Sequence, residues 1–385
     1  MATIFVYAPF RAASETFTSN QLKATQLASD IMFVERYCEV GEFAFSVPAK
    51  DGICQYLNMG NLIAVDGEYW GIIREVQQRD GVVKVTGEDL KGLLGQRITL
   101  YPEQTEGSGL QGYDAIKDVS TETLVKYFVA GNAVTPSDPN RAIIGLELAP
   151  DQGRGEPRDA YMTRFETLPD LLRKNLELRK MGWEIKADLA RSKYVFDVVQ
   201  GLDRTGLQYD NPRVIFDVEL RSALAIEYAH SSKSFRNLFY ASLAKSRSTE
   251  QVPTCMYPRD ESKPAPSGVD RREQHLNVSI SVEVTDLYAQ LKAYALKDAE
   301  QYRATETISV EDAGKYEFKA DYNLGDTVTI QAHGGVAESL AGDAQLISVT
   351  TTWLPSGGLK RDLLLGEARI TRLGALKRQM KNEGE

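Results

Sequence analysis

The sequence predicts an α+β protein that is predominantly β, with two strand-rich, barrel-like lobes and a small α/β insertion. Three observations lead to this fold class. Short segments of alternating apolar and polar side chains dominate residues 1–100, the clearest helical patterns gather between residues 101 and 202, and strand-like segments return from about residue 213. A chain of 385 residues is long enough for two to four compact units, at about 100–200 residues per domain.

The first lobe opens with strands, and residues 42–47 give the clearest pattern. Phe43, Phe45 and Val47 fall on alternating positions, so one face of this strand should lie in the core and the other should be wet. Short strand-like pieces continue to about residue 88, at the density expected of a sandwich or a small barrel.

A hairpin with a helical turn ends the first lobe. Residues 67–73 and 83–88 are predicted as two strands joined across the polar turn at 77–81. Gly87 leads the chain into one helical turn that is rich in leucine. Together these features predict a barrel hairpin with a helical plug.

Two helices are expected in the insertion. The first covers about 121–130, with Ser120 or Thr121 as its N-cap. The second starts after Thr167, because a proline and an aspartate stand in its first turn, and Gly182 is expected to end it.

A second hairpin follows these helices. Residues 183–186 and 194–198 alternate in polarity as two strands, and the second helix should pack on them. The sequence therefore predicts three domains, with the first completed by strands from a later segment. They are 1–100 (completed by strands from 203–250), the inserted 101–202, and 203–385 with a helix near 285–303.

Composition narrows the classes of function. Formal net charge is −9, and lysine and arginine are scattered rather than clustered. A protein that grips nucleic acid normally shows a basic face, so specific nucleic-acid binding is not expected. No apolar run is long enough for a membrane span, and the N-terminus lacks an export signal. Cys38, Cys54 and Cys255 are an odd number without CxxC spacing, which favours reduced thiols in a cytoplasmic folding environment.

We identify no catalytic, cofactor-binding or metal-ligating residue, and expect neither a cofactor nor an enzyme. His230, His275 and His333 share no ligand spacing. The GxGxxG spacing at 107–112 is not preceded by a strand, so it predicts a loop rather than a dinucleotide site. Adjacent carboxylates such as Glu88–Asp89 stand in turn or capping contexts rather than as an acid/base pair.

Tyr69 and Trp70 are candidate interface residues. They are neighbours on a hairpin strand, where side chains alternate between the two faces of a sheet. One ring should therefore pack in the core, while the other should be partly exposed. An exposed ring could bind a sugar or a partner subunit.

Asp203 and Arg204 are further candidates. After Gly201, the simplest interpretation is a reverse turn in which the Asp203 carboxylate caps the following backbone. The alternative is an ion pair at an interface. Gly325–Asp326 is likewise expected to form a turn, which starts the strand at 327–330.

Arg271, Arg272 and Glu273 complete the candidate interface. They open a predicted strand at 274–280, so Arg271 and Glu273 should point to one side and Arg272 to the other. Two interpretations remain open. Either this is a solvated strand start, or one arginine bridges lobes or subunits through a two-bond contact with a carboxylate.

Four pieces carry a resemblance to a known family. Residues 60–97, 201–205, 268–273 and 322–328 are turns with flanking strand residues, and their order resembles the tail hub of long-tailed, siphovirus-type phages. The resemblance spans roughly residues 30–370 and extends in architecture to the hubs of contractile tails.

The resemblance implies a structural virion protein at the tail tip or baseplate, encoded by a phage or prophage. Such hubs carry two similar barrels per chain and form homotrimers, which adapt the sixfold tail tube to a threefold tip and open for genome ejection. The implied partners are a distal tail ring protein, the tape-measure protein and a receptor-binding or spike protein. Assembly would take place in the bacterial host cytoplasm.

Two alternatives stay open. The first is a tail-tip cell-wall hydrolase or carbohydrate-binding protein, which an acid/base pair in a cleft and the release of wall fragments would identify. The second is the hub of a bacterial contractile injection apparatus, which neighbouring genes would distinguish from a phage.

Overall fold

The computed structural model describes residues 2–101, 114–157, 161–243, 254–256, 266–278, 302, 305–333 and 339–369. The expected fold class is confirmed, because the protein is predominantly β with a few short helices. The chain divides into two compact units. One unit comprises Met1–Glu227 and Ser309–Glu385, and the other comprises Tyr228–Ile308. The predicted GxGxxG loop at 107–112 lies outside the described residues, as does the helix near 285–303 apart from Tyr302.

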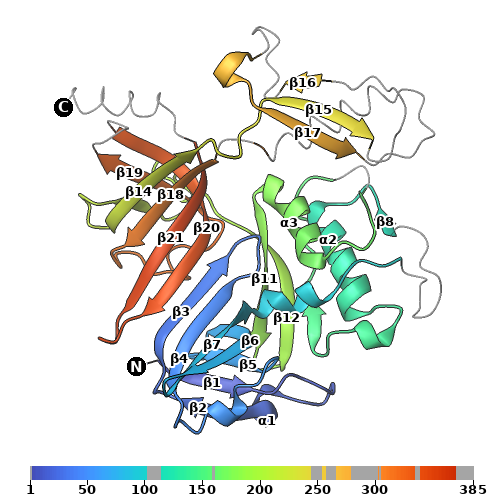
Figure 1. The fold of residues 1–385 in the computed structure, drawn as a ribbon, viewed down its shortest axis with the longest axis vertical. Coiled ribbons are helices and arrows are strands. Elements are labelled where there is room, and N and C mark those ends of the chain that lie inside the picture. Colours follow the sequence, from blue (N-terminus) through green and yellow to red (C-terminus); the bar gives the residue numbers. More distant parts are fainter. Residues whose placement is uncertain are drawn as a thin grey trace. The chain divides into compact units, whose positions relative to one another are not determined.

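The first unit begins with strands, continues through helices and a hairpin, and ends with strands (Figure 1). The N-terminal elements are β1 (Ile4–Tyr7), α1 (Phe17–Asn20), β2 (Gln21–Thr25), β3 (Ser29–Arg36), β4 (Glu42–Pro48), η1 (Cys54–Tyr56), β5 (Leu62–Val65), β6 (Tyr69–Arg79), β7 (Val82–Asp89) and η2 (Leu90–Gln96). The middle elements are β8 (Asp114–Ile116), α2 (Thr121–Val129), the π-helical η3 (Ala130–Val134), η4 (Pro139–Arg141), β9 (Leu146–Leu148), β10 (Tyr161–Thr163), α3 (Leu168–Leu176), η5 (Glu177–Arg179), β11 (Met181–Asp188) and β12 (Lys193–Gln200). The later strands are β13 (Ile215–Asp217), β14 (Ala223–Ser231), β18 (Thr305–Asp312), β19 (Thr327–His333), β20 (Ser339–Trp353) and β21 (Leu359–Arg369).

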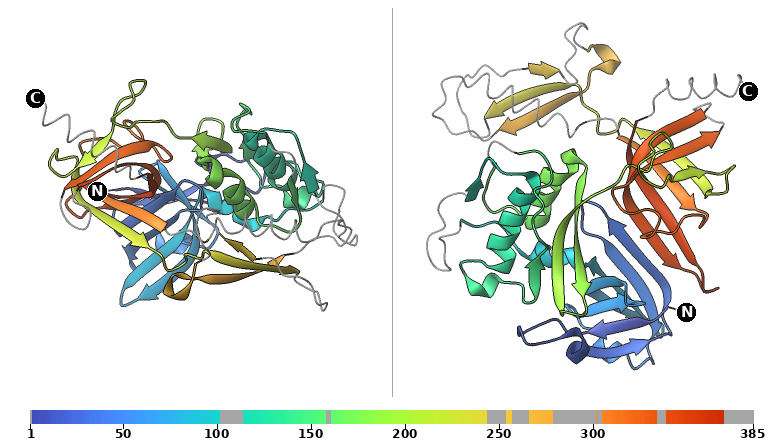
Figure 2. Two further views of the ribbon diagram at one scale, coloured as in Figure 1. Left: turned by 90° about the horizontal axis from the view of Figure 1, so that it is seen from above. Right: turned by 180° about the vertical axis from the view of Figure 1, so that it is seen from behind.

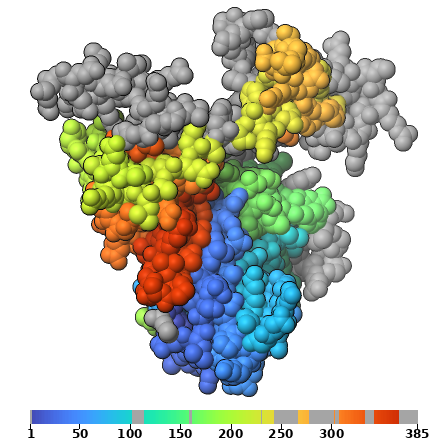
Figure 3. Space-filling model, turned by 60° about the vertical axis from the view of Figure 1, so that its left-hand side comes forward, coloured from blue at the N-terminus to red at the C-terminus, as the bar shows by residue number. Residues whose placement is uncertain are grey.

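The N-terminal and C-terminal strands form one continuous sheet. Its order is β14-β18-β21-β20-β3-β4-β7-β6-β5-β1-β2, and β19 pairs with both β20 and β13. The two sets of strands meet where β20 runs antiparallel to β3, with Ser348 opposite Arg36 and Thr352 opposite Met32. In Figure 3 the red C-terminal strands accordingly lie directly against the blue N-terminal strands.

The strand that extends the first lobe differs from the expected one. Strands from 203–250 were expected to complete this lobe, but β13 pairs with β19 and β14 lies next to β18. The neighbour of β3 is instead β20, from the C-terminal part of the chain. Local alternation identifies a strand without identifying its partner, because pairing depends on contacts between distant segments. The three proposed domain boundaries remain a prediction.

Strand β5 and the first half of β6 are buried on both faces. Ile63, Val65 and Tyr69 belong to the interior of the lobe, together with Phe43 and Phe45. The intervening side chains of the same strands point the other way, into a second core that they share with the middle elements. This second core contains Leu62, Ala64, Trp70 and Ile72 from β5 and β6, and Leu124, Phe128, Leu172, Trp183 and Phe196 from the middle elements.

This two-sided burial corrects the expectation for Tyr69 and Trp70. One ring was expected to be partly exposed, but Tyr69 is 5% exposed and Trp70 is 7% exposed. The alternation itself is right, since the two rings enter different cores. The error lay in assuming that the outer face of the strand meets water, whereas this face enters the core shared with the middle elements and Trp70 packs there against Tyr7 and Phe17.

The strand pattern at 42–47 is confirmed, whereas the hairpin turn is shorter than the predicted 77–81 because β6 runs to Arg79. Phe43, Phe45 and Val47 are buried, while the side chains between them are only half-buried. The hairpin turn consists of Asp80 and Gly81, which both have positive φ, as a two-residue hairpin turn of this type requires.

The middle elements form a small α/β layer. The hairpin β11–β12 is extended by β9, which runs parallel to β12, and the helices α2 and α3 lie on one side of it (Figure 2). Ser120 caps α2 by accepting a hydrogen bond from the amide of Thr123, and Thr167 caps α3 from the amide of Asp170. Both predicted N-caps are therefore confirmed, Ser120 being the residue used in the first helix.

The predicted end of the second helix is wrong. Gly182 was expected to end it, but α3 is followed by η5 and the chain turns at Lys180, whose φ is 55°. Gly182 lies inside strand β11 instead. Glycine there serves close packing rather than helix termination, because a Cβ on Gly182 would come within 2.3 Å of the Tyr37 ring.

The second unit contains a mixed three-stranded sheet and a short helix, η6 (Gly268–Asp270). Its strands are β15 (Leu238–Leu243), β16 (Thr254–Met256) and β17 (Glu273–Val278). Strand β15 is central and runs antiparallel to β16 and parallel to β17. One face carries the buried side chains of Phe239, Ala241 and Leu276.

A charged network lies beneath helix α2. Glu122 is fully buried, and its carboxylate accepts from Lys126 Nζ at 2.6 Å and from Arg154 Nε at 2.9 Å. Lys126 and Arg154 also contact Asp197 on β12, at 2.9 and 3.3 Å. Burial by itself would raise the pKa of Glu122, but the hydrogen bonds from Lys126 and Arg154 outweigh it and lower the pKa to about 2.

The lowered pKa predicts acid sensitivity that depends on Glu122. The contribution of this carboxylate to stability is present above its ordinary pKa of 4.5 and is lost as pH falls towards about 2. Over this interval the wild-type protein should lose about 3 kcal/mol of unfolding free energy through this group. Glu122→Gln should be less stable at neutral pH and should lose less on acidification, as measured by denaturant unfolding at several pH values.

A matched control is Glu177→Gln, because Glu177 is 61% exposed and forms only a surface ion pair with Arg173. That variant should show the same acid profile as the wild type. An equally steep loss of stability in Glu122→Gln would contradict the role assigned to the network.

Candidate functional site

The first lobe, the insertion and the C-terminal strands meet at Tyr37, which follows β3 directly and is 2% exposed. Its hydroxyl lies 3.1 Å from the carbonyl oxygen of Lys180 and 3.0 Å from that of Val199, which can accept its proton. The same oxygen accepts from the amide of Gly201 at 3.1 Å. Burial raises the pKa of Tyr37, so the hydroxyl stays protonated and able to donate.

The backbone of Tyr37 binds two further segments. Its amide donates to the carbonyl of Ile347 on β20 at 2.9 Å, and its carbonyl accepts from the amide of Trp183 on β11 at 3.2 Å. One residue thus holds the hairpin of the insertion and the long C-terminal strand to the end of β3. We call Tyr37 and the backbone that it binds the Tyr37 junction.

Two glycines allow this approach. A Cβ on Gly325 would lie 2.3 Å from the Tyr37 ring, and a Cβ on Gly201 would lie 1.9 Å from the carbonyl oxygen of Gly325. The φ of Gly325 is also +89°, a conformation that other residues rarely adopt. The turns predicted at these glycines are therefore also points of close contact between chain segments.

The buried side chain of Lys91 binds backbone carbonyls of the turn that contains Tyr37. Its ammonium donates to the carbonyls of Arg36, Tyr37 and Glu39, the last two at 3.3 and 3.2 Å, and lies 4.9 Å from the centre of the Trp183 ring. Burial lowers the pKa of Lys91. A buried ammonium with three carbonyl acceptors is the arrangement that satisfies all its donors.

Asp89 and Cys38 line the same region. Asp89 caps η2 by accepting from the amide of Lys91 at 3.0 Å, and burial raises the pKa of its carboxyl to about 6. The capping interpretation of the Glu88–Asp89 pair is thus confirmed for Asp89. Cys38 donates to the carbonyl of Met181 at 3.0 Å, and burial raises its pKa to about 12, so it is a protonated structural thiol.

A buried ion pair closes the other side of the junction. Arg204 Nε donates to Asp326 Oδ2 at 2.6 Å, and their side chains are 8% and 2% exposed. Asp326 also accepts from the amides of Leu202 and Asn323, at 2.7 and 2.9 Å. The carboxylate is therefore compensated by one cation and two amides, as a buried charge must be.

The predicted turns around this pair are confirmed. The Asp203 carboxylate accepts from the amide of Thr205 at 2.9 Å, which is the expected cap, and Asp326 directly precedes β19. Each interpretation of Asp203–Arg204 is right for one of the two residues, since Asp203 caps a turn and Arg204 forms an ion pair. That pair joins two segments of one chain. A contact of either residue with another subunit remains a prediction.

A cleft of about 850 Å³ opens beside the junction. Residues from β3, β6, β11 and the segment before β19 line it, including Glu35, Tyr69, Lys91, Trp183, Lys319 and Asp326. Its charged groups are largely engaged, since Lys319 contacts Glu35 at 3.1 Å and lies 4.1 Å from the centre of the Tyr69 ring.

Within the described ranges, no cluster of histidine, cysteine, aspartate and glutamate is arranged to hold a metal ion. No described helix is long and apolar enough to cross a membrane.

The remaining candidate residues lie in the second unit. Arg271 and Glu273 point to one side, as expected, because Arg271 Nε contacts Glu273 Oε1 at 2.5 Å and Nη2 contacts the Tyr240 hydroxyl at 2.7 Å. Arg272 points away and its guanidinium donates to the carbonyl of Ser232. All three side chains of 271–273 are exposed. Their role in an interface remains a prediction.

The sequence of the chain matches the profile of a family described as Siphovirus ReqiPepy6 Gp37-like protein, over residues 20–367. The chain belongs to this family. No curated protein matches the chain.

Two solved structures share the fold. The tail protein from Neisseria meningitidis MC58 is 14% identical with a TM-score of 0.52, over 96% of this chain and 97% of its own. The 43 kDa tail protein of prophage MuSo2 from Shewanella oneidensis is 12% identical with a TM-score of 0.51, over 94% and 98%. The resemblance to a siphovirus family is therefore confirmed, and the fold is one that solved phage and bacterial tail proteins share.

Two residues of the junction were missed by the sequence analysis. Lys91 stands between leucines in the predicted helical turn, and a lysine in an apolar pattern was a usable signal of burial. Tyr37 gave no local signal, because the acceptors of its hydroxyl lie 143 and 162 residues further along the chain. The apolar run Leu62–Val65 was the signal for two-sided burial of the first lobe.

The Tyr37 hydroxyl should contribute measurably to stability. Tyr37→Phe keeps the ring but leaves the buried amide of Gly201 and two carbonyls without their shared partner. The free energy of unfolding should fall by about 1–3 kcal/mol in denaturant titrations of the purified chain. The control Tyr56→Phe should change little, because the Tyr56 hydroxyl bonds to no residue in the described part of the chain. Equal stability of the two variants would remove Tyr37 from this role.

Proposed function

We propose that this tail protein is the hub that closes the distal end of the tail tube. The observation that supports the proposal is the continuous sheet in which N-terminal and C-terminal strands meet at the β3–β20 pair. A hub chain of this kind has to offer two strand-rich lobes to the tube, and here both sets of strands belong to one sheet.

The Tyr37 junction gives this arrangement a mechanical basis. Its hydrogen bonds and close glycine contacts fix the insertion, β3 and β20 to one another. Tightly packed contacts of this type resist continuous deformation. Two lobes fixed within one chain act as a single building block, so three chains would present six lobes to a sixfold tube and a threefold face to the tip.

The proposed partners follow from the same position. A hub at the end of the tube would contact a distal tail ring protein, the tape-measure protein and a receptor-binding or spike protein. Its task would be binding and opening rather than catalysis. A net charge of −9 suits a surface that DNA passes without sticking.

Reconstruction of the native particle without imposed symmetry tests this function. We expect a ring of three copies at the distal end of the tube, since closed rotational symmetry is the usual outcome of repeated identical contacts. Six copies, or one asymmetric copy, would contradict the proposed symmetry adaptation. Density for the chain along the tube or at the head end would contradict the proposed location.

Charge reversal at Arg271 and Arg272 tests the candidate interface. Both residues are exposed and directly precede β17, so Arg271→Glu and Arg272→Glu should change the unfolding free energy by less than about 1 kcal/mol. We expect one of the two variants to be absent from purified particles in a complementation assay. Arg173→Glu, on helix α3, is the matched control. Normal particle yield and infectivity with both variants would return these residues to the solvated surface.

A further inference from the structure

Arg97, at the end of the first lobe, and Arg141, in the insertion, lie together, and neither forms an ion pair within the described part of the chain. Arg97 Nε donates to the carbonyl of Arg141 at 2.5 Å, and Arg141 Nη2 donates to the carbonyl of Ile98 at 2.5 Å. Within the described ranges, neither guanidinium comes within 4.0 Å of a carboxylate. Burial lowers the pKa of both side chains, and the charge of Arg97 lowers that of Arg141 further. Two like charges are thus held side by side at a cost to the isolated chain.

A buried asparagine fixes this pair. Asn132 is 1% exposed, and its Oδ1 accepts from the amide of Leu100 at 3.0 Å and from Arg141 Nη2 at 3.3 Å. Asn132 belongs to the π-helical turn η3, which continues α2. Such turns are rare and occur frequently at functional sites. The position of Arg141 is therefore built by the fold and is not a chance surface contact.

The exposed aromatic residue Phe165 belongs to the segment that pairs with residues 97–99. The amide of Phe165 donates to the carbonyl of Thr99 at 2.9 Å, while Ile98 bridges to Thr167. Phe165 has a φ of 58° and is 42% exposed, and Ile98 is 41% exposed. A large aromatic residue in the left-handed region is a backbone outlier, of the kind that persists where the surrounding structure enforces it.

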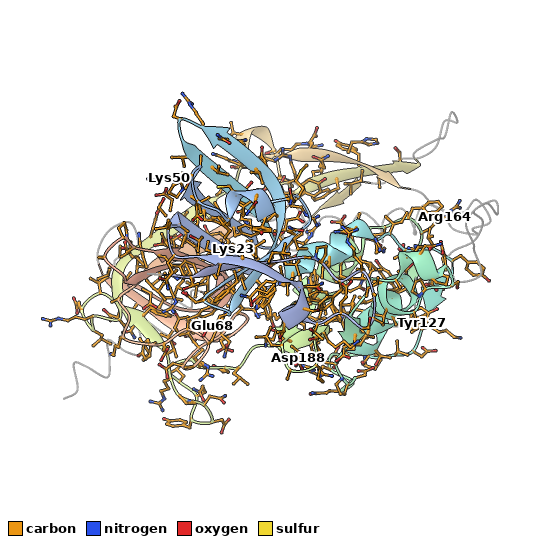
Figure 4. All side chains as sticks on the ribbon, turned by 90° about the horizontal axis from the view of Figure 1, so that it is seen from below. Lys23, Lys50, Glu68, Tyr127, Arg164 and Asp188 are labelled. Atoms are coloured by element: carbon orange, nitrogen blue, oxygen red, sulfur yellow. The ribbon has the colours of Figure 1, made fainter. Side chains whose placement is uncertain are left out.

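Phe165 also carries a cation on its face. The guanidinium carbon of Arg164 lies 4.6 Å from the centre of the Phe165 ring, and Figure 4 shows Arg164 at the periphery of the insertion. Two guanidinium groups, an exposed aliphatic side chain and an exposed aromatic ring thus belong to the segment 97–99 or to residues whose hydrogen bonds reach it. We call Arg97, Ile98, Arg141 and Phe165 the arginine–aromatic patch.

We propose that the arginine–aromatic patch binds a segment of a partner protein that presents a carboxylate next to an apolar side chain. The carboxylate would take the two-bond geometry that guanidinium offers and neutralise the paired charges of Arg97 and Arg141. The apolar side chain would cover Ile98 and Phe165. Arginine and aromatic residues are the types that contribute most to protein interfaces.

Charge complementarity decides the class of partner. A phosphate backbone would also meet the arginines, but it would leave the aliphatic and aromatic half of the patch uncovered. An acidic, partly apolar peptide satisfies both halves. This inference concerns a surface where the first lobe continues into the insertion, and it does not depend on where the chain lies in the particle.

A labelled peptide that alternates glutamate and leucine tests the proposal on the full-length purified chain. Fluorescence anisotropy should detect saturable binding that weakens with salt, while the matched peptide with glutamine in place of glutamate should bind at least tenfold more weakly. Arg141→Gln should reduce affinity for the acidic peptide about tenfold. Phe165→Gly should do the same, and because glycine accepts positive φ, its thermal stability should equal or exceed that of the wild type.

Two variants of the same layer serve as controls. Leu178→Ser removes another exposed aliphatic side chain, which is 66% exposed, and Arg173→Gln removes another surface arginine. Both should bind the acidic peptide with wild-type affinity. Absence of saturable binding, or equal losses in the controls and in the patch variants, would overturn the proposal. It would also fail if a single-stranded oligonucleotide of equal charge bound as tightly as the peptide and depended on Arg141 but not on Phe165.

Discussion

The structure of the first unit depends on a single buried hydroxyl group. Tyr37 ends the strand that links the two sets of strands, and its side chain reaches the carbonyls of Lys180 and Val199 and the amide of Gly201. Val199 lies near the end of β12, while Lys180 and Gly201 lie just outside the β11–β12 hairpin. Burying them without the hydroxyl would leave several polar groups unsatisfied, which costs more than one net hydrogen bond contributes. The glycines at 182, 201 and 325 exist to let this ring and this backbone approach.

The insertion packs against the outer face of strands β5 and β6 of the first lobe. Strands β5 and β6 send alternate side chains into two cores, one inside the lobe and one shared with α2, α3 and the β11–β12 hairpin. The buried network of Glu122, Lys126, Arg154 and Asp197 then fixes the loop after β9 to the outside of this layer. A part of the chain that looks like an independent module in sequence is in this way integral to the packing of its neighbour.

Sequence analysis predicted what is encoded locally. The alternation of Phe43, Phe45 and Val47, the N-caps at Ser120 and Thr167, and the Asp203 turn depend on residues within a few positions of one another, and all were confirmed. The expectations that failed concerned partners distant in sequence. Trp70 packs against Tyr7 and Phe17, more than fifty positions earlier, and Gly182 lies against the ring of Tyr37 rather than at a helix end. β20 pairs with β3 across 313 positions, which no local pattern indicates. The resemblance to tail proteins succeeded because it rests on the order of several turns along the whole chain, which single-residue patterns do not use.

The β3–β20 pair has a consequence for how the protein folds during its synthesis. Ser348 Oγ donates to the carbonyl of Glu35, a residue 313 positions earlier, so the two strands are synthesised far apart in time. Until β20 leaves the ribosome, one edge of β3 has no neighbour, and an open edge invites pairing with other chains. Contacts between such distant segments also slow the final folding step. A nascent chain therefore cannot complete the sheet before β20 has been translated, 313 positions after Glu35, which delays its competence for assembly until that point.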